Sequence, residues 1–308
     1  MEITAPAPVF SRKNMAYLSA TLCCLLWGSS YPAIKNGYAL FQIATDDIPS
    51  KIVFAGYRFL LAGLLLLLFA LAQGKPVTGL SRRQFGQLTA LGLTQTSIQY
   101  AFFYVGLAYT TGVKGSIMNA TGTFFSVLLA HVIYQNDKLS LNKSLGCIVG
   151  FLGVMLVNFN HSLMDFSFTW QGDGFIVLAA FILSAAMLYG KRLSQTLDPT
   201  VMTGWQLAIG GAALVAGGYL TGGTLVVHSV TALAVLGYLI LLSSVAFALW
   251  SVILKYHRVS MIAPFNFVIP VAGTVLSAVF LGENILEWKY ALALVLVCSG
   301  IRWVNKRG

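Results

Sequence analysis

Residues 229–254 read SVTALAVLGYLILLSSVAFALWSVIL, a run without a single charged side chain. Lipid offers no hydrogen-bond partner to a backbone N–H or C=O, so a run of this length inside a bilayer must be helical. About 20 apolar residues are enough to cross the hydrocarbon core. This stretch therefore predicts a transmembrane helix, and with it an all-α integral membrane protein.

Similar stretches fill the chain almost from end to end. Hydrophobic residues make up 57% of the sequence and charged residues only 9%, against roughly 25% charged residues in a soluble domain. This composition excludes a second, soluble domain. The pattern predicts ten transmembrane helices, over residues 15–36, 52–72, 85–109, 113–134, 140–157, 174–190, 199–220, 229–254, 261–281 and 285–304.

The 19 Lys and Arg residues predict how the chain is oriented. With the N-terminus in the cytoplasm and the spans alternating, fourteen of them fall on the inner side and five on or toward the outer side. Because short cytoplasmic loops are enriched in Lys and Arg, this bias places both termini in the cytoplasm and predicts a multi-pass protein of the cell membrane. Residues 1–14 are then a cytoplasmic tail. The basic residues are dispersed and form no basic face, which argues against nucleic-acid binding.

The second half of the sequence resembles the first. Residues 109–157, YTTGVKGSIMNATGTFFSVLLAHVIYQNDKLSLNKSLGCIVGFLGVMLV, correspond to residues 255–304, KYHRVSMIAPFNFVIPVAGTVLSAVFLGENILEWKYALALVLVCSGIRWV, and Glu283 then corresponds to Asp137. The sequence predicts two five-helix repeats, residues 15–158 and 172–304. Five crossings insert the second repeat upside down relative to the first. Inverted repeats are typical of secondary transporters, whose solute site lies between the repeats near the membrane midplane.

Several short elements resemble a known family. WGSSYPAIK (residues 27–35), Arg58 early in the second span, GDGF (residues 172–175) and LGE (residues 281–283) are similar to elements of the EamA branch of the drug/metabolite transporter superfamily. The resemblance extends over residues 15–304 and implies export of amino acids or other small metabolites. The first repeat departs from it at Gln135, Asn136 and Asp137, where the family usually has glycine and glutamate, and it lacks a proline equivalent to Pro270.

Polar side chains inside the spans predict the wall of the solute path. Such groups are costly unless they face protein or a water-filled cavity. They share helix faces in the third, fourth and ninth spans, where they predict either this wall or helix-to-helix hydrogen bonds. These faces are Gln95, Gln99, Phe102 and Gly106 in the third span, Ser116, Asn119, Thr123 and Ser126 in the fourth, and Asn266, Pro270, Thr274 and Ser277 in the ninth. Aromatic and basic residues of the first and eighth spans add groups that can stack on a solute or bind a carboxylate. The candidate substrate-binding residues are Trp27, Tyr31, Lys35, Arg58, Gln95, Gln99, Asn119, Thr123, Trp250, Asn266 and Pro270.

Arg58 has two competing interpretations. It either pairs with a carboxylate of the solute or extends toward the outer surface beside Asp46 and Asp47. No Asp or Glu lies in the middle of a predicted span, so a proton relay built on a midplane carboxylate has no candidate. We interpret Asp173 and Glu283, at helix boundaries, as structural caps.

Other functions have less support. An intramembrane enzyme needs an acid–base pair, a metal constellation or an activated nucleophile, and the four scattered histidines provide none, so the sequence predicts no catalytic residue, metal site or cofactor. The short loops leave little surface for a sensor or scaffold. An exchanger of anionic or phosphorylated metabolites remains an alternative. Gly146, Gly150 and Gly153 share one face of the fifth span and predict a close helix contact, either within the fold or across a homodimer.

Overall fold

A computed structural model describes residues 9–110, 112–159, 168–281 and 288–306 of the chain. These residues form helices and connecting loops, and no β-strand occurs among them. Short 3-10 segments are η1 (Val9–Ser11) and η5 (Ala263–Phe267), and π-helical turns are η2 (Leu93–Ile98) and η4 (Trp170–Gly174). The α-helices are α1 (Lys13–Leu40), α2 (Ile48–Ala72), α3 (Arg82–Gly92), α4 (Gln99–Ala108), α5 (Gly112–Ala120), α6 (Gly122–Ile133), α7 (Leu141–Val157), α8 (Phe175–Leu193), α9 (Pro199–Leu220), α10 (Val230–Tyr256), α11 (Val259–Ile262), α12 (Val268–Leu281) and α13 (Trp288–Val304).

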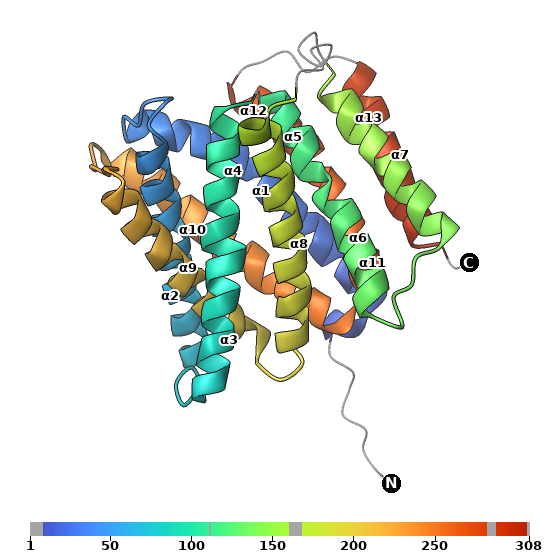
Figure 1. The fold of residues 1–308 in the computed structure, drawn as a ribbon, viewed down its shortest axis with the longest axis horizontal. Helices are drawn as coiled ribbons and strands as arrows, with labels where there is room; N and C mark the ends of the chain where they lie inside the picture. Colours follow the sequence, from blue (N-terminus) through green and yellow to red (C-terminus); the bar gives the residue numbers. More distant parts are fainter. Residues whose placement is uncertain (1–8, 111, 160–167, 282–287, 307–308) are drawn as a thin grey trace.

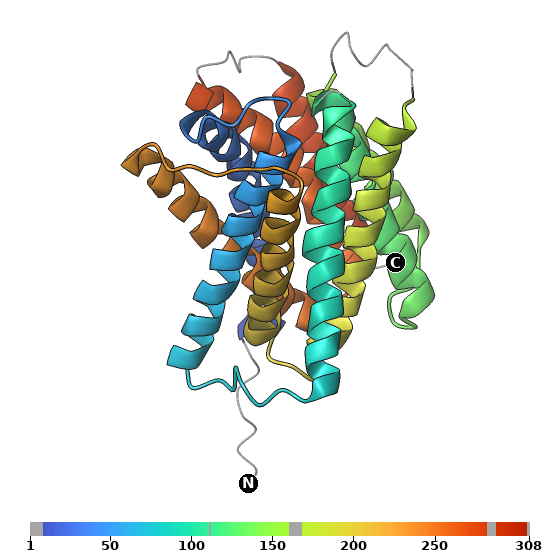
Figure 2. The ribbon, with the colours of Figure 1, turned by 60° about the vertical axis from the view of Figure 1, so that its left-hand side comes forward.

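The structure confirms the all-helical class. Within the described part of the chain, six continuous helical segments are both long and apolar enough to cross a membrane, and they cover residues 48–72, 114–133, 170–193, 199–220, 230–256 and 259–277. Helices α3–α4 and α8 stand side by side (Figures 1 and 2), whereas α1 and α10 run obliquely behind them (Figure 1). The first residues of the tenth predicted span lie outside the described residues, and α13 begins at Trp288.

Local sequence signals fix several helix ends. The second helix begins at Ile48, four residues earlier than predicted, because the Asp47 side chain accepts the backbone N–H of Ser50 at 2.9 Å and Pro49 occupies the first turn. The earlier start places Arg58 deeper in the helix than the sequence suggests. At α3, Ser81 and Gln84 form a reciprocal capping box.

The third predicted span is continuous but changes its helical type. Residues 93–98 form the π-helical turn η2 between α3 and α4. Thr94 donates its hydroxyl hydrogen to the carbonyl of Ala90 at 2.7 Å within this segment. Because a π turn holds more residues than an α turn, it shifts the faces of α4 relative to those of α3.

Two antiparallel pairs of helices flank the bundle, α2 with α9 and α7 with α13 (Figure 1). In the first pair, Gly56 and Gly63 of α2 meet Gly211 and Gly204 of α9 in reverse order. A Cβ atom on Gly211 would lie 2.2 Å from the backbone nitrogen of Leu60, so only glycine allows this approach. Close van der Waals packing of this kind is what holds helices together in lipid.

The glycines of α7 are used inside the fold. A Cβ on Gly146 would lie 2.6 Å from the carbonyl oxygen of Gly300, and one on Gly153 would lie 2.8 Å from that of Ala293. Gly150 lies against the ring of Phe267. The predicted glycine face is therefore occupied by α13 and η5 of the same chain.

Helices α1, α6, α8 and α12 occupy the middle of the bundle (Figure 1). Tyr17 of α1 stacks on Phe265, and Gly28, further along α1, lies against Ala272 of α12, so the two segments run parallel. Helices α6 and α8 also run parallel, as their contacts in the next subsection show. These four helices separate the two flanking pairs.

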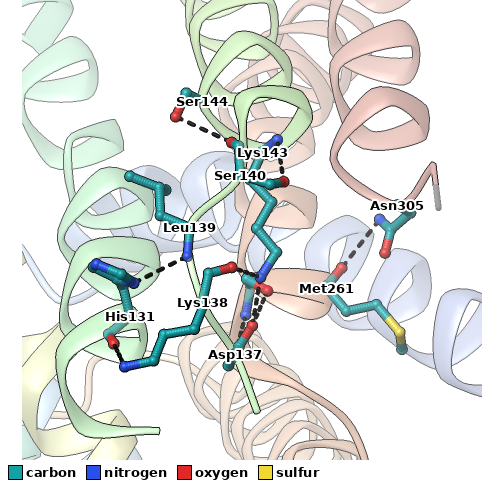
Figure 3. Close-up of polar contacts among 10 residues, drawn as sticks. His131, Asp137, Lys138, Leu139, Ser140, Lys143, Ser144, Met261 and Asn305 are labelled. Carbon is teal, nitrogen blue, oxygen red and sulfur yellow. Dashed lines mark hydrogen bonds and ion pairs between the residues drawn. The ribbon is translucent and has the colours of Figure 1, made fainter. Parts of the chain in front are cut away.

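Both ends of the described chain meet at the link between α10 and α11. The Nε2 atom of His257 lies 2.8 Å from the carbonyl oxygen of Phe10, which precedes α1. The side chain of Asn305, which follows α13, donates to the carbonyl of Met261 at 3.3 Å (Figure 3). We call this side of the bundle the terminal end and the other side the distal end.

Candidate functional site

A cavity of about 220 Å³ lies among the helices of the bundle. A water molecule needs roughly 10–15 Å³ on this scale, so the space is large enough for a solute of amino-acid size together with water. The wall combines helices of both halves of the chain, from α1 and α2 through α10 and α12. It includes Trp27, Ser30, Tyr31, Arg58, Gln95, Gln99, Tyr100, Phe103, Tyr104, Ser116, Asn119, Thr123, Ser126, Ser184, Lys191, Gln206, Phe247, Trp250, Ser251, Asn266 and Pro270.

Ten of the eleven candidate substrate-binding residues predicted from the sequence lie in this wall, and Lys35 does not. Lys35 is exposed near the distal end of α1, one turn beyond Tyr31. Tyr31 is 42% exposed although it belongs to the wall, because its ring borders the hollow. The four polar residues predicted on one face of the fourth span also lie together here; they are Ser116, Asn119, Thr123 and Ser126.

The face predicted for the third span is only partly correct. Gln95 and Gln99 border the cavity, but Phe102 packs on Phe175 and Gly106 packs on Ile176 of α8. Beyond η2 the wall is formed instead by Tyr100, Phe103 and Tyr104. A constant α-helical repeat was assumed in the prediction, and the π-helical turn breaks that repeat.

Other wall residues were missed. Gln206 is 1% exposed in α9 and donates to the hydroxyl of Thr96 at 3.2 Å. Its position as a lone amide inside an apolar helix is the same signal that identified Gln99. Phe247 and Ser184 carried no such signal, since an aromatic ring or a small hydroxyl in a span usually serves packing.

Arg58 is a buried cation in the cavity wall. Its side chain is 4% exposed, its Nε donates to the Ser243 hydroxyl at 2.7 Å, and its guanidinium lies 5.0 Å from the centre of the Phe59 ring. It does not extend toward Asp46 or Asp47. An arginine in the middle of a membrane helix costs about 2.5–3.5 kcal/mol on insertion scales, so a cavity or a ligand has to compensate it.

Three further polar atoms in the wall have no hydrogen-bond partner among the described residues. They are Nε1 of Trp27, Oε1 of Gln99 and Oγ1 of Thr123, and each is buried. An unpaired buried donor or acceptor costs about 1–3 kcal/mol. In addition to Arg58, the wall therefore presents the Trp27 donor, the Gln99 acceptor and the Thr123 hydroxyl, which can donate or accept.

Aromatic rings make up much of the remaining wall. Trp27 packs edge-on against Phe247 and Trp250, with ring centroids 5.3 and 5.1 Å apart. Tyr100 lies beside Phe59 at 4.6 Å and beside Tyr104 at 6.1 Å. Rings arranged in this way offer flat apolar surfaces to a solute.

Apolar packing borders the cavity on its terminal side, where Leu254 and Lys191 also belong to the wall. Below Trp250 lies a cluster of buried apolar residues from α1, α6, α8, α10 and α11, including Cys24, Ala130, Leu188, Ile253 and Ile262. The parallel helices α6 and α8 are joined here by the Tyr134 hydroxyl, which donates to the Leu188 carbonyl at 3.1 Å, and nearer the cavity by the hydroxyls of Ser126 and Ser184, 3.1 Å apart. Lys191 donates its ammonium hydrogens to the carbonyls of Leu254 and His257 at the end of α10.

Asp137, between α6 and α7, joins the two halves of the chain at this end. Its carboxylate accepts the backbone N–H of Ser260 at 3.0 Å and the Ser260 hydroxyl, at the start of α11. Lys143 donates to the same carboxylate at 2.8 Å (Figure 3). Burial alone would raise the pKa of Asp137, but the hydrogen bonds from Lys143 and Ser260 outweigh it and hold the pKa below its usual value.

Asp173 has the structural role predicted for it. It lies inside η4, which continues into α8, and accepts the Thr110 hydroxyl at 2.7 Å and, at the start of this helical segment, the backbone N–H of Thr169 at 3.0 Å. It therefore ties η4 to the end of α4. Glu283 lies outside the described residues. Among the residues that the structure describes, no cluster of His, Cys, Asp or Glu has the arrangement of a metal site.

Comparison with known proteins identifies the class. The model of the EamA-like transporter family matches the chain twice, over residues 14–159 and 170–306. An "Uncharacterized transporter" of Archaeoglobus fulgidus is 26% identical over 88% of this chain and 91% of its own length. A "Probable amino-acid metabolite efflux pump" of Salmonella typhimurium is 24% identical over 94% of each chain. A crystal structure with 18% identity superposes with a TM-score of 0.78 over 95% of this chain and 96% of its own, which shows a shared fold.

Proposed function

The chain belongs to the EamA-like transporter family of multi-pass membrane proteins, and we propose that it is a secondary transporter that exports small polar metabolites, with amino acids as the substrate class. The observation that carries this proposal is the cavity between the two halves, whose wall holds unpaired polar groups and aromatic rings. Such a wall can bind a polar solute, whereas the same unpaired polar groups would only destabilise a helix bundle that binds no solute. The name of the Salmonella relative agrees with amino acids as cargo.

We further propose that ten spans form two inverted repeats. The family model matches each half of the chain separately. The helix neighbours have the symmetry that two repeats predict. The first span, α1, runs parallel to α12 of the ninth span, and its counterpart in the second repeat, α8, runs parallel to α6 of the fourth span. The antiparallel pairs α2–α9 and α7–α13 each join a helix to its own counterpart. An exchange of this kind supports alternating access, in which the halves swap conformations around a fixed site.

The distribution of basic residues favours a cytoplasmic location of the terminal end in a cell membrane. In this orientation we infer that the apolar cluster around Ile253 and the Asp137–Ser260 contact close the cavity toward the cytoplasm. The exposed ring of Tyr31 lies on the side of the cavity nearer the distal end. This conformation then corresponds to an outward-facing state of the transport cycle.

Uptake of radiolabelled amino acids into proteoliposomes tests this function. The Gln99→Leu variant removes the unpaired acceptor from the wall and is expected to abolish flux with the fold intact. Gln73→Leu, beyond the end of α2 and outside the cavity, is the matched control and should transport like the wild type. Absence of flux for every solute class, or equal flux in the two variants, would contradict the proposal.

An exchanger of anionic or phosphorylated metabolites is the second candidate. Arg58 and Lys191 in the wall favour it, because both are cations and no carboxylate of the described residues lies in the wall beside them. Exchange of labelled phosphate esters between the two sides of the vesicle membrane, with amino acids inactive, would establish this function in place of amino-acid export.

A further inference from the structure

Arg58 is a cation of the cavity wall that no acid among the described residues neutralises. Its only hydrogen bond to a described residue goes to Ser243. The ion pairs among the described residues join Lys75 with Asp198 and Lys143 with Asp137, and neither involves Arg58. A guanidinium carries five N–H donors, so most of its hydrogen-bonding capacity remains for a ligand in the cavity.

The described acids are engaged elsewhere or exposed. Asp47 caps α2, Asp137 binds Ser260, and Asp198 caps α9 and pairs with Lys75. Asp173 ties η4 to α4, and Asp46 is exposed. None of them borders the cavity. Among the described residues no acid balances Arg58, so an anionic group of a solute in the cavity would supply that charge.

The donors of the other cation of the wall, Lys191, are already engaged. Its ammonium group donates to the carbonyls of Leu254 and His257 near the terminal end. Arg58 therefore remains as the wall cation with donors to spare, and its planar fork matches the two oxygens of a carboxylate in a bidentate contact. A phosphate group can use the same fork, so the binding test below includes a phosphate probe.

The rest of the wall indicates what the carboxylate is attached to. Oε1 of Gln99 is an unpaired acceptor and the Thr123 hydroxyl can accept or donate, so both suit an ammonium or hydroxyl group of the solute. The rings of Trp27, Tyr100 and Phe247 form the apolar part of the wall. A carboxylate with an apolar or aromatic body can occupy both parts at once.

We propose that Arg58 binds the carboxylate of the transported solute, so that the site selects carboxylates with an apolar or aromatic body and excludes the corresponding amines. This inference rests on the proposed transport function and names the chemical group that the site requires. Arg58 then makes the contact that determines specificity, and Ser243 orients its guanidinium group.

Three probes with a common phenyl ring test the requirement: L-phenylalanine, phenethylamine and phenyl phosphate. Binding is measured as thermal stabilisation of the purified wild-type protein in detergent, which does not depend on flux. We expect stabilisation by L-phenylalanine and none by phenethylamine at the same concentration. Equal stabilisation by phenethylamine, stronger stabilisation by phenyl phosphate, or no stabilisation by L-phenylalanine would each overturn the inference.

Variants of α2 locate the effect. Arg58→Gln should weaken L-phenylalanine binding by roughly 10- to 100-fold, the range expected for loss of a charge-assisted contact, and Arg58→Lys should retain part of the affinity. Lys51→Gln removes a cation of the same helix outside the cavity and should bind normally. Wild-type affinity in a folded Arg58→Gln protein would overturn the assignment, and the wild-type probe profile decides the matter if that variant does not fold.

Transport measurements separate this inference from the proposed function. Flux of amines and carboxylates alike, unaffected by Arg58→Gln, would leave a transporter without the proposed selectivity. Binding of L-phenylalanine that depends on Arg58, with no flux of any carboxylate in proteoliposomes, would uphold the site and refute the transport function.

Discussion

Asp137 accepts the backbone N–H of Ser260 at 3.0 Å, although 123 positions separate the two residues. This contact joins the loop after α6 in the first half of the chain to the start of α11 in the second half. Lys143 completes the cluster at 2.8 Å (Figure 3). The cluster lies at the terminal end of the bundle, where the halves have to separate if the cavity is to open toward that side.

Removal of the Asp137 charge should destabilise the described conformation. Asp137→Asn weakens the hydrogen bonds from Lys143 and Ser260, each of a kind worth about 1.5–3 kcal/mol when charged. We expect the apparent melting temperature in detergent to fall by roughly 5 °C. Asp46→Asn removes the same charge from an exposed position and should leave it unchanged. Equal melting of all three proteins would show that the cluster does not hold the halves together.

The same carboxylate predicts a pH dependence. The pKa of Asp137 in the folded protein lies below its ordinary value of 3.8. A lowered pKa contributes stability that is fully present above the ordinary value and is lost as the pH falls through the folded-state pKa. The difference in melting temperature between wild type and Asp137→Asn should therefore be constant from pH 7 to about pH 5 and should vanish under more acidic conditions. A difference that persists at the most acidic pH would contradict this assignment.

Ser243 should affect solute affinity without touching the solute. Ser243→Ala removes the acceptor for Nε of Arg58, so the guanidinium loses its fixed orientation. We expect the apparent affinity for L-phenylalanine to fall by about 5- to 10-fold, with the preference over phenethylamine retained. Ser244→Ala, which removes a buried hydroxyl that donates to the carbonyls of Ala62 and Ile240, is the control. A larger loss in the control would indicate a general packing effect of α10.

Packing of α2 on α9 should not tolerate a side chain at Gly211. A Cβ there would lie 2.2 Å from the backbone nitrogen of Leu60, so Gly211→Val forces the helices apart. We expect loss of the monodisperse peak in size-exclusion chromatography after solubilisation. Gly217→Ala, on the same helix with open space around its Cβ, should purify like the wild type. Normal behaviour of Gly211→Val would mean that the two helices are not in close contact.

The sequence predicted the helices well because apolar length is a local property. The predicted start of α2 was wrong because it followed the apolar run from Ile52, whereas the Asp47 cap and Pro49 start the helix about one turn earlier. The predicted face of α4 was wrong because η2 is a local departure from α-helical geometry. The sequence could not choose between the two interpretations of Arg58, because the partner of that side chain, Ser243, lies 185 positions away. Polar residues in apolar helices predicted much of the cavity wall. An aromatic residue such as Phe247 gives no such prediction, because the sequence does not distinguish a ring that lines a cavity from one that packs between helices.

Accessibility of single cysteines tests the central claim most directly. In a background without the four native cysteines, Ser116→Cys places a thiol in the wall toward the distal end, and Ser251→Cys places one toward the terminal end. A membrane-impermeant thiol reagent should modify Ser116→Cys from the distal side and, during turnover, Ser251→Cys from the side that carries the termini, with solute protecting both. Failure of the reagent to reach Ser251→Cys from that side under any condition would contradict alternating access through this cavity.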